Sequence, residues 1–498
     1  MYAVEMKDII KRFGSFTANN GITLLVKKGE IHCLLGENGA GKSTLMNILF
    51  GLYRQDSGEI RINGKSVENH SPLAASRMGL GMVHQHFMLV DALSVWENVV
   101  VGLEPGGFRI DRKESIRKVQ ELSDRYHFEL NAEEQVGNLS VGMKQRVEIL
   151  KTVYRGAEII IMDEPTAVLS PPEVEQFLMI LRDMRADGKT IIFITHKLKE
   201  TLAVADRITV LRAGKSVSTI EAGNASAREL AGMMVGHEVD LEIERPFNEA
   251  GGAVLSVEGL RLLPNAASTV SFDIREGEIF GIAGVEGNGQ KQLEEMIMGL
   301  IKCREGRISV LGKDVTKLGT RKRRQLGIGY IPSDRLNRAL LSSFSLEDNY
   351  LLGKQFSDNY VRHGIVRHKA VKEAAGTLMR EYDVRAAGMD QAAGSLSGGN
   401  QQKLVVGREA SDEPKLIIAC QPVRGLDIGA IHYIHEILLK LRKEGKAILL
   451  ISAELTDIQQ LSDRIAVLYK GEILAARKNE DFTEEEIGLL IAGHREAV

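Results

Sequence analysis

The sequence reads Gly36-Glu37-Asn38-Gly39-Ala40-Gly41-Lys42-Ser43-Thr44 near its start, and this stretch decides the fold. It matches G-x-x-x-x-G-K-[ST], a loop whose backbone N–H groups form an anion nest between a strand and a helix. The apolar residues 31–35 before it predict a buried strand. After it, the helical spacing of an apolar face is shown by Leu45, Ile48, Leu49 and Leu52. We therefore expect an α/β fold that binds a nucleotide, with Lys42 reaching its β- and γ-phosphates and Ser43 ligating Mg²⁺.

The same scaffold recurs 248 positions later (284 − 36), without the same chemistry. The second stretch reads Gly284-Val285-Glu286-Gly287-Asn288-Gly289-Gln290-Lys291. Its glycines match, but Gln290 stands at the lysine position and Lys291 at the hydroxyl position. Residues 279–283 again predict a strand, and the matching helix face consists of Leu293, Met296, Ile297 and Leu300. Repetition over this length indicates duplicated domains rather than a solenoid.

A second repeated motif places the domain boundaries. Leu139-Ser140-Val141-Gly142-Met143 aligns with Leu396-Ser397-Gly398-Gly399-Asn400 at an offset of 257 (396 − 139). The second copy must therefore carry nine additional residues (257 − 248) opposite the stretch between residues 85 and 139 of the first. A polar stretch with Gly251 and Gly252 separates the copies. We expect a first domain over residues 1–240, a linker over 241–252 and a second domain over 253–498.

Composition excludes several other classes of protein. A chain of 498 residues is too long for one core, and its net charge of −3 with a pI near 6.5 shows no electrostatic footprint for nucleic acid. The basic run at 321–324 is interpreted as a solvated helix face rather than a phosphate-backbone site. Cys33, Cys303 and Cys420 fit neither a disulfide framework nor a zinc pattern, and the two that lie in apolar strand-like runs are expected to be buried thiols. No segment has 18 consecutive apolar residues, and the charged N-terminus does not match a signal peptide, so we expect a cytoplasmic protein without a membrane span.

An acidic pair supplies the second half of the catalytic argument. Residues 159–162 are apolar and run into Asp163 and Glu164, which places both carboxylates at the C-terminal tip of a central strand. Asp163 can hold Mg²⁺ through water, and Glu164 can polarise the attacking water. The alternative is a strand that runs into a helix N-terminus, where acids are favoured without any catalytic role. The phosphate loop upstream makes this alternative much weaker.

Taken in order, the loop, Gln85, Leu-Ser-x-Gly, Asp163-Glu164-Pro165-Thr166 and Thr195-His196 resemble the ATP-binding cassette of ABC transporters. The resemblance implies two tandem P-loop NTPase domains, each with an α/β core, an antiparallel β subdomain and a helical subdomain. It implies ATP and Mg²⁺ as ligands. It also implies that Gln85 touches Mg²⁺, that His196 contacts the γ-phosphate and that Phe13 stacks on adenine. Phe13 could instead belong to the core.

In this family two cassettes are thought to pack head to tail, with each ATP between one phosphate loop and the opposite signature. The departures in this chain then fall on one composite site, whose residues are Gln290, Lys291, Ser333, Cys420, Gln421, Ala453, Met143 and Ser170. The other composite site is complete, with Lys42, Ser43, Gln85, Asp163, Glu164 and His196 from the first copy and Ser397, Gly398, Gly399, Asn400 and Asp427 from the second. We expect the two cassettes to pair within one chain and only the complete site to hydrolyse ATP, while the degenerate site could still bind nucleotide.

The resemblance covers the whole chain and is greatest to tandem ATPase subunits of bacterial sugar and nucleoside importers. The loop at 284–290 and Gln421-Pro422-Val423-Arg424-Gly425-Leu426-Asp427 carry it, and residues 82–90 and 284–290 look most like the nucleoside importers of this group. A nucleoside importer is favoured over a monosaccharide (ribose or galactose) importer. The partners implied are two membrane permease subunits and an extracytoplasmic solute-binding protein, which would place this chain at the cytoplasmic face of the cell membrane. The rival is a soluble tandem-cassette ATPase of translation or nucleic acid, which typically has a long charged linker and two competent sites.

The apolar residues after Gln85 allow two interpretations. These residues are Phe87, Met88, Leu89, Val95 and Trp96. In the family this region receives the permease, so exposed apolar side chains would form a partner surface. Alternatively, they form the core of the helical subdomain.

Overall fold

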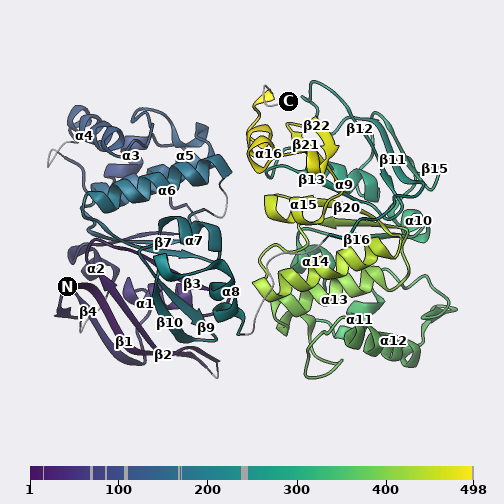
Figure 1. The fold of residues 1–498 in the computed structure, drawn as a ribbon, viewed down its shortest axis with the longest axis horizontal. Helices are drawn as coiled ribbons and strands as arrows, with labels where there is room; N and C mark the ends of the chain where they lie inside the picture. The colour runs from purple at the N-terminus through teal and green to yellow at the C-terminus, as the bar shows by residue number, and fades with distance from the viewer. Residues whose placement is uncertain are drawn as a thin grey trace. The chain divides into compact units, whose positions relative to one another are not determined.

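The structure is a computed structural model, which describes residues 1–14, 16–67, 71–84, 87–105, 110–166, 169, 171–236 and 245–495, without the side chains of 171 and 172. The chain divides into two compact units, Met1–Asp240 (unit 1) and Leu241–Val498 (unit 2). Figure 1 shows both units. Among the described helices, none is long and apolar enough to cross a membrane.

Unit 1 is built on two sheets. The six-stranded sheet has the order β10-β9-β3-β8-β7-β6 and is parallel from β9 to β6, with β10 added antiparallel. Its central strands are fully buried and mostly apolar, as parallel strands covered on both faces require, and the buried His32 of β3 is satisfied by Glu30 and Thr209. An antiparallel sheet, β2-β1-β4-β5, lies at one end of the unit, and α3, α4 and α5 lie at the other (Figure 1).

The strands of unit 1 are β1 (Tyr2–Phe13), β2 (Phe16–Lys27), β3 (Ile31–Gly36), β4 (Ser57–Ile62), β5 (Lys65–Ser66), β6 (Leu80–Val83), β7 (Ile159–Asp163), β8 (Thr190–Thr195), β9 (Arg207–Arg212) and β10 (Lys215–Glu221). Its helices are α1 (Lys42–Leu49), α2 (Pro72–Arg77), α3 (Val95–Val100), α4 (Arg112–Arg125), η1 (Val136–Asn138), α5 (Val141–Tyr154), α6 (Pro171–Ala186), α7 (Leu198–Val204), η2 (Ala222–Asn224) and α8 (Ala227–Val235).

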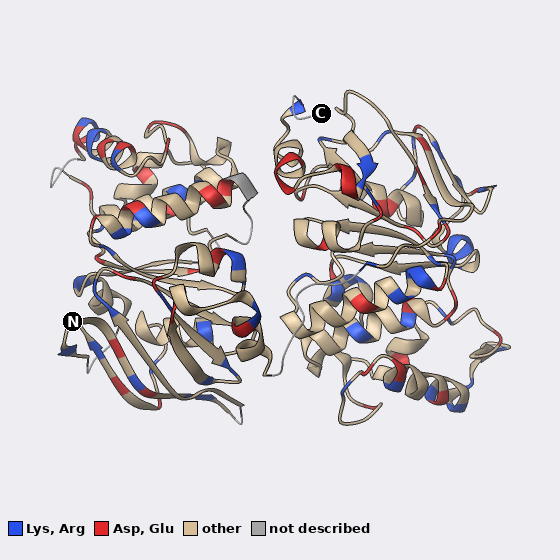
Figure 2. Cartoon of the chain, in the orientation of Figure 1, with Lys and Arg blue, Asp and Glu red and all other residues tan. Residues whose placement is uncertain are grey.

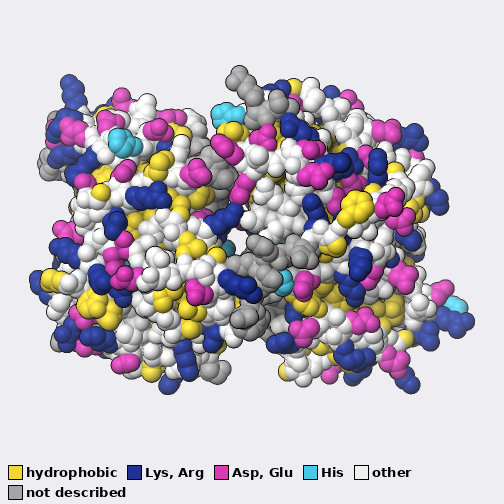
Figure 3. Space-filling model, in the orientation of Figure 1, with side chains coloured by type: hydrophobic (Ala, Val, Ile, Leu, Met, Phe, Trp, Pro, Cys, Tyr) yellow, Lys and Arg dark blue, Asp and Glu magenta, His cyan; other side chains and the backbone are white. Residues whose placement is uncertain are grey.

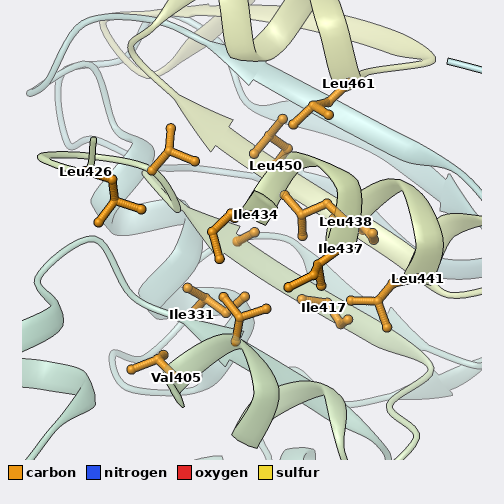
Figure 4. Close-up of a cluster of buried hydrophobic side chains, with 14 of the residues drawn as sticks. Ile331, Val405, Ile417, Leu426, Ile434, Ile437, Leu438, Leu441, Leu450 and Leu461 are labelled. Carbon is orange, nitrogen blue, oxygen red and sulfur yellow. The ribbon is translucent and has the colours of Figure 1, made fainter. Parts of the chain in front are cut away.

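Unit 2 repeats this plan. Its six-stranded sheet has the order β16-β19-β20-β13-β21-β22, and its antiparallel sheet has the order β12-β11-β14-β15. Figure 4 shows the core under the sheet, where Ile331, Val405, Ile417, Leu426 and Ile434 turn toward one another from strands, helices and a loop. The described residues of the expected linker contact this unit, because Arg442 donates to Pro246 O at 2.8 Å and Gly251 N–H donates to Glu276 O at 2.8 Å.

The strands of unit 2 are β11 (Ala253–Leu260), β12 (Val270–Arg275), β13 (Ile279–Ala283), β14 (Arg307–Val310), β15 (Lys313–Asp314), β16 (Ile328–Ile331), β17 (Val361–Arg362), β18 (Ile365–Val366), β19 (Leu416–Cys420), β20 (Ala447–Ser452), β21 (Arg464–Tyr469) and β22 (Glu472–Lys478). Its helices are α9 (Gln290–Met298), α10 (Thr320–Gln325), η3 (Arg335–Ala339), α11 (Leu346–Leu351), α12 (His368–Glu381), η4 (Ala393–Ser395), α13 (Gly398–Ala410), α14 (Ile428–Lys443), α15 (Leu455–Leu461), η5 (Asn479–Asp481) and α16 (Glu484–Ile491).

The nine additional residues of the second copy lie in three places. The offset between the copies is 248 at the start of β6 and β16 (328 − 80) and 251 at α3 and α11 (346 − 95). It rises to 256 at α4 and α12 (368 − 112) and reaches 257 at η1 and η4 (393 − 136). The three-residue step contains the π-helical turn η3, and the five-residue step contains the hairpin β17–β18.

This fold tests the expected helix faces after the two phosphate loops, the expected solvated basic run and the expected burial of the cysteines. The first two expectations are wrong in part. Leu52 and Leu300 are 49% and 46% exposed, because α1 and α9 end before them at Leu49 and Met298. The basic run is not a solvated face throughout, since Arg323 is 1% exposed. Its guanidinium donates to the carbonyls of Met296 and Ile297 at the end of α9. Cys33 and Cys420 are buried thiols, as expected.

Opposite charges alternate along the outer helices. Figure 2 shows Lys or Arg and Asp or Glu side by side on α4 and α12. On α4, Arg117 bridges to Glu114 and Glu121 at i−3 and i+4. Such exposed pairs contribute little to the stability of a helix, so these helices depend on the packing of their apolar faces.

Candidate active site

The phosphate loop of unit 1 turns between β3 and α1 at two glycines with left-handed backbone angles. Gly39 has φ +84° and Gly41 has φ +98°. A Cβ on Gly41 would lie 2.5 Å from Asn19 Nδ2 and 2.6 Å from Ala18 O, so only glycine fits there. The fully buried Asn19 donates from Nδ2 to Gly41 O at 3.0 Å and holds the end of the loop. Sequence reasoning missed Asn19, because a single polar residue in a strand carries no motif.

Lys42 is the first residue of α1 and lies folded into the loop. Its side chain is buried, and Nζ donates to Gly36 O at 2.7 Å and to Glu37 O at 2.9 Å. Burial lowers the pKa of Lys42, while Glu164, Asp163 and Glu37 oppose this shift. The ammonium is thus held at the nest where nucleotide phosphates would bind, with carboxylates close enough to keep it charged.

Ser43 and Asp163 form the candidate metal site. Asp163 ends β7 and is 7% exposed, and Ser43 Oγ donates to its Oδ1 at 3.4 Å. Burial raises the pKa of Asp163, and the hydrogen bond from Ser43 opposes this shift. A hydroxyl and a carboxylate that face each other beside a phosphate loop are the hard oxygen ligands that Mg²⁺ prefers, so the residues fit this ion. Gln85, the third predicted ligand, lies outside the described residues.

Glu164 follows the strand at a strained position. Its φ is +47°, in the left-handed region that costs a side-chain-bearing residue about 1–2 kcal/mol. Glu164 N–H donates to Ile194 O at 3.0 Å, and Oε1 lies 3.1 Å from Nδ1 of His196. The bond to His196 lowers the pKa of Glu164 against the opposing effect of burial. Glu164 is therefore an ionised carboxylate, as a group that polarises water must be.

The second phosphate loop has the backbone conformation of the first but lacks its catalytic side chains. Gly287 and Gly289 have φ of +97° and +111°, and Gln421 has φ +47°, the value of Glu164. Gln290 Nε2 donates to Val285 O at 2.9 Å, which reproduces the bond from Lys42 to Glu37 O without the charge. Cys420 stands where Asp163 stands, and complete burial raises the pKa of its thiol. Ser333 and Ala453 offer no equivalent of Gln85 or His196.

The signature of unit 2 is the N-terminus of α13. Ser397 is its N-cap, with Oγ accepting from Asn400 N–H at 3.4 Å and from Asn400 Nδ2 at 2.9 Å. Asp427 caps α14 beside it, accepting from Ala430 N–H at 2.7 Å. A Cβ on Gly399 would lie 3.0 Å from Ala430 Cβ and 3.7 Å from Asp427 Oδ2. The fold thus brings the predicted signature and Asp427 together.

In unit 1 the corresponding helix, α5, also begins at a serine cap. Ser140 Oγ accepts from Met143 N–H at 3.3 Å. Met143 has no side-chain amide, so it cannot repeat the second bond that Asn400 makes to its serine. Ser170 lies outside the described residues.

Comparison with known proteins assigns the chain to a family. A family model described as ABC transporter matches residues 19–167 and again residues 267–424. The chain belongs to the ABC transporter family. The two matches begin 248 residues apart (267 − 19), which is the offset between the two phosphate loops. Each unit is therefore one ATP-binding cassette with a P-loop NTPase α/β fold.

Curated relatives match nearly the full length of this tandem-cassette ABC chain. A guanosine import ATP-binding protein of Bacillus subtilis is 48% identical over 99% of this chain and 98% of its own length. A nucleoside import ATP-binding protein of Lactococcus lactis is 46% identical over 98% of each chain. A glucose import ATP-binding protein of Haloferax volcanii is 42% identical over 99% of this chain and 96% of its own length.

Exposure decides between the alternatives for Phe13, whereas the apolar residues after Gln85 are divided between buried and exposed, with Phe87 and Leu89 half-buried. Phe13 is 45% exposed and meets Tyr53 edge to face at 5.6 Å, so it is not a core residue, and its stacking on adenine stays a prediction. Val95 and Trp96 are buried in the helical part. Met88 and Val90 are 64% and 54% exposed and could contact a partner. On the face shown in Figure 3, apolar side chains are interspersed with charged ones.

Proposed function

We propose that this chain is the ATP-hydrolysing subunit of a nucleoside importer. The observation that carries the proposal is the asymmetry between its cassettes. Lys42, Ser43, Asp163, Glu164 and His196 converge in the first cassette. Their counterparts in the second have lost every charge that binds the metal or activates water. Hydrolysis then takes place in one composite site, and the signature and Asp427 of the second cassette complete this site. The other composite site is non-hydrolytic.

In this site the residues of the first cassette divide the chemistry. The loop backbone and Lys42 bind the β- and γ-phosphates, and Glu164 accepts the proton of the attacking water. His196 orients the Glu164 carboxylate, 3.1 Å from its Nδ1, and would donate to the γ-phosphate. Ser43, Asp163 and Gln85 would hold Mg²⁺, which would supply positive charge against the phosphates. Phe13 supplies an aromatic face for adenine.

Nucleoside is preferred to monosaccharide as the transported solute. The relatives named for guanosine and nucleoside import are 48% and 46% identical, and the one named for glucose import is 42% identical. The partners are then two permease subunits and an extracytoplasmic solute-binding protein, and the chain lies at the cytoplasmic face of the membrane. The exposed Met88 and Val90, which follow Gln85 in the sequence, offer an apolar contact for a permease.

Uptake by the assembled transporter tests this function. Proteoliposomes that contain the complete transporter should take up radiolabelled guanosine when supplied with ATP, and unlabelled nucleosides should compete while ribose and galactose should not. Glu164→Gln should lower ATP turnover and uptake about a hundredfold or more, since it removes the base, while ATP binding persists. Competition by ribose alone would assign a monosaccharide. Turnover at half the wild-type rate in Glu164→Gln would contradict the single hydrolytic site.

A further inference from the structure

The connection between β16 and α11 in unit 2 contains an element with no counterpart among the described residues of unit 1. It is three residues longer than the connection in unit 1 and makes the π-helical turn η3 shortly after Ser333, the counterpart of Gln85 in the sequence. Asp334 caps this turn, accepting from Asn337 N–H at 3.0 Å. Single π-helical turns are rare and often mark functional positions. Two arginines of the turn, Arg335 and Arg338, reach in different directions.

Arg338 ties the turn to α9, the helix that follows the degenerate loop. Its Nη2 lies 2.7 Å from Glu295 Oε1, and its Nη1 lies 3.4 Å from Glu294 Oε1. The side chains of Glu294 and Glu295 are only 3% and 13% exposed, while that of Arg338 is 30% exposed, so the carboxylates are the buried partners. Removing one partner from a buried ion pair leaves an uncompensated charge and costs far more than breaking an exposed pair. This contact therefore fixes the turn to α9.

Arg335 ties the same turn to the signature helix. Its Nε donates to Gln401 Oε1 at 3.2 Å, and Gln401 is held in turn by the carbonyls of Leu396 and Ala393. A Cβ on Gly398 would lie 3.1 Å from Arg335 Nη2, so the guanidinium lies against the first residue of α13. One short turn thus connects the helix of the lost phosphate loop to the signature.

Unit 1 lacks these partners in its sequence. At the offset of 248, Met46 and Asn47 occupy the positions of Glu294 and Glu295, so α1 carries no anion there. At the offset of 257, Val141 occupies the position of Gly398, and it would crowd an arginine placed like Arg335. The double tie is therefore specific to the unit whose signature is intact and whose own loop is degenerate.

We propose that Arg335 and Arg338 are positioning residues that hold the signature of unit 2 in its ATP-binding orientation before nucleotide arrives. The inference rests on the proposed function, in which this signature completes the hydrolytic site. A signature that moved freely would occupy its binding orientation only part of the time, and the apparent affinity for ATP would fall by that fraction. Saturating ATP would restore the orientation, so kcat would be preserved.

Steady-state ATPase kinetics of the assembled transporter test this role. Arg335→Gln, Arg338→Gln and the double variant should raise the KM for ATP about three- to tenfold, with kcat within about twofold of wild type. Glu295→Arg combined with Arg338→Glu should bring the KM back toward wild type, because it restores the ion pair with reversed charge. Arg304→Gln, at an exposed residue of the same unit, is the matched control and should change neither constant.

Hydrogen exchange on the full chain without nucleotide gives an independent readout. The amides of the first turn of α13, where Gln401 N–H donates to Ser397 O at 2.9 Å, should exchange faster in the double variant than in wild type. An unchanged KM with unchanged exchange would overturn the proposal. So would a lower kcat at constant KM with a lower Tm, since that pattern indicates misfolded protein. If Glu164→Gln kept its turnover, the proposed function would fail, and the exchange measurement alone would decide the role of the two arginines.

Discussion

At the scale of single residues, the two cassettes differ in side chains more than in backbone. Glu164 and Gln421 share φ +47°, and each N–H donates to the adjacent strand, to Ile194 O at 3.0 Å and to Ile451 O at 2.7 Å. A strained angle persists only where the surrounding structure enforces it. The fold therefore sets the position of this residue, and the side chain placed there decides whether water is activated.

Asn19 offers a test of how the active loop is held. Its bond to Gly41 O exists only in the first cassette, because the corresponding position, at the offset of 248, is Ala267. Asn19→Ala removes a buried hydrogen bond worth about 1 kcal/mol. We expect roughly fivefold weaker ATP binding, measured by titration of a fluorescent ATP analogue, with kcat retained.

Asn20 supplies the control for this prediction, because its side chain is exposed one position further along β2. Asn20→Ala should leave the affinity for the analogue unchanged. Equal losses in both variants would mean that the strand as a whole, rather than the bond from Asn19, supports the loop.

At the scale of elements, the sequence predicts the middle of each strand and helix better than its ends. The apolar runs at 31–35 and 279–283 became β3 and β13, because buried parallel strands need continuous apolar side chains. The apolar periodicity predicts that the helix face continues to Leu300. The helix α9 ends earlier, at Met298, because Gly299 follows it with φ +71°. The sequence predicts an exposed Arg323, because it does not show that the carbonyls at the end of α9 accept hydrogen bonds from this side chain.

Arg323 should stabilise unit 2 through these carbonyls. It donates to Met296 O, Ile297 O and Leu318 O from a buried position. Arg323→Ala leaves buried acceptors without donors, at about 1–3 kcal/mol for each one that water cannot reach. We expect the unfolding transition of unit 2 to move to lower denaturant concentration, followed by circular dichroism.

Lys322→Ala is the matched control, since this neighbour on α10 is exposed. Its effect on the free energy of unfolding should stay within about 0.5 kcal/mol. If both variants behaved alike, the carbonyl contacts of Arg323 would contribute nothing to stability.

At the scale of the whole molecule, the order of the motifs along the chain predicts an ATP-hydrolysing cassette. The loop, the acidic pair and the histidine are far apart in the sequence, and the structure brings Lys42, Ser43, Asp163, Glu164 and His196 together. Residues that act through geometry alone, such as Asn19 and Arg338, could not be predicted. Their types are common at helix ends and surfaces, and only their contacts in the folded unit distinguish them.

ATP hydrolysis requires every catalytic group of a site, so restoring one residue should not make the second site hydrolytic. Gln421 has the backbone angle of Glu164, so glutamate fits there without added strain. The site would still lack the charge of Lys42, the hydroxyl of Ser43 and the carboxylate of Asp163, and Glu294 beside Cys420 is already paired with Arg338. In the assembled transporter, Glu164→Gln with Gln421→Glu should release phosphate as slowly as Glu164→Gln alone, while Gln421→Glu alone should match wild type. A tenfold recovery in the double variant would show that the missing base was the only defect of the second site.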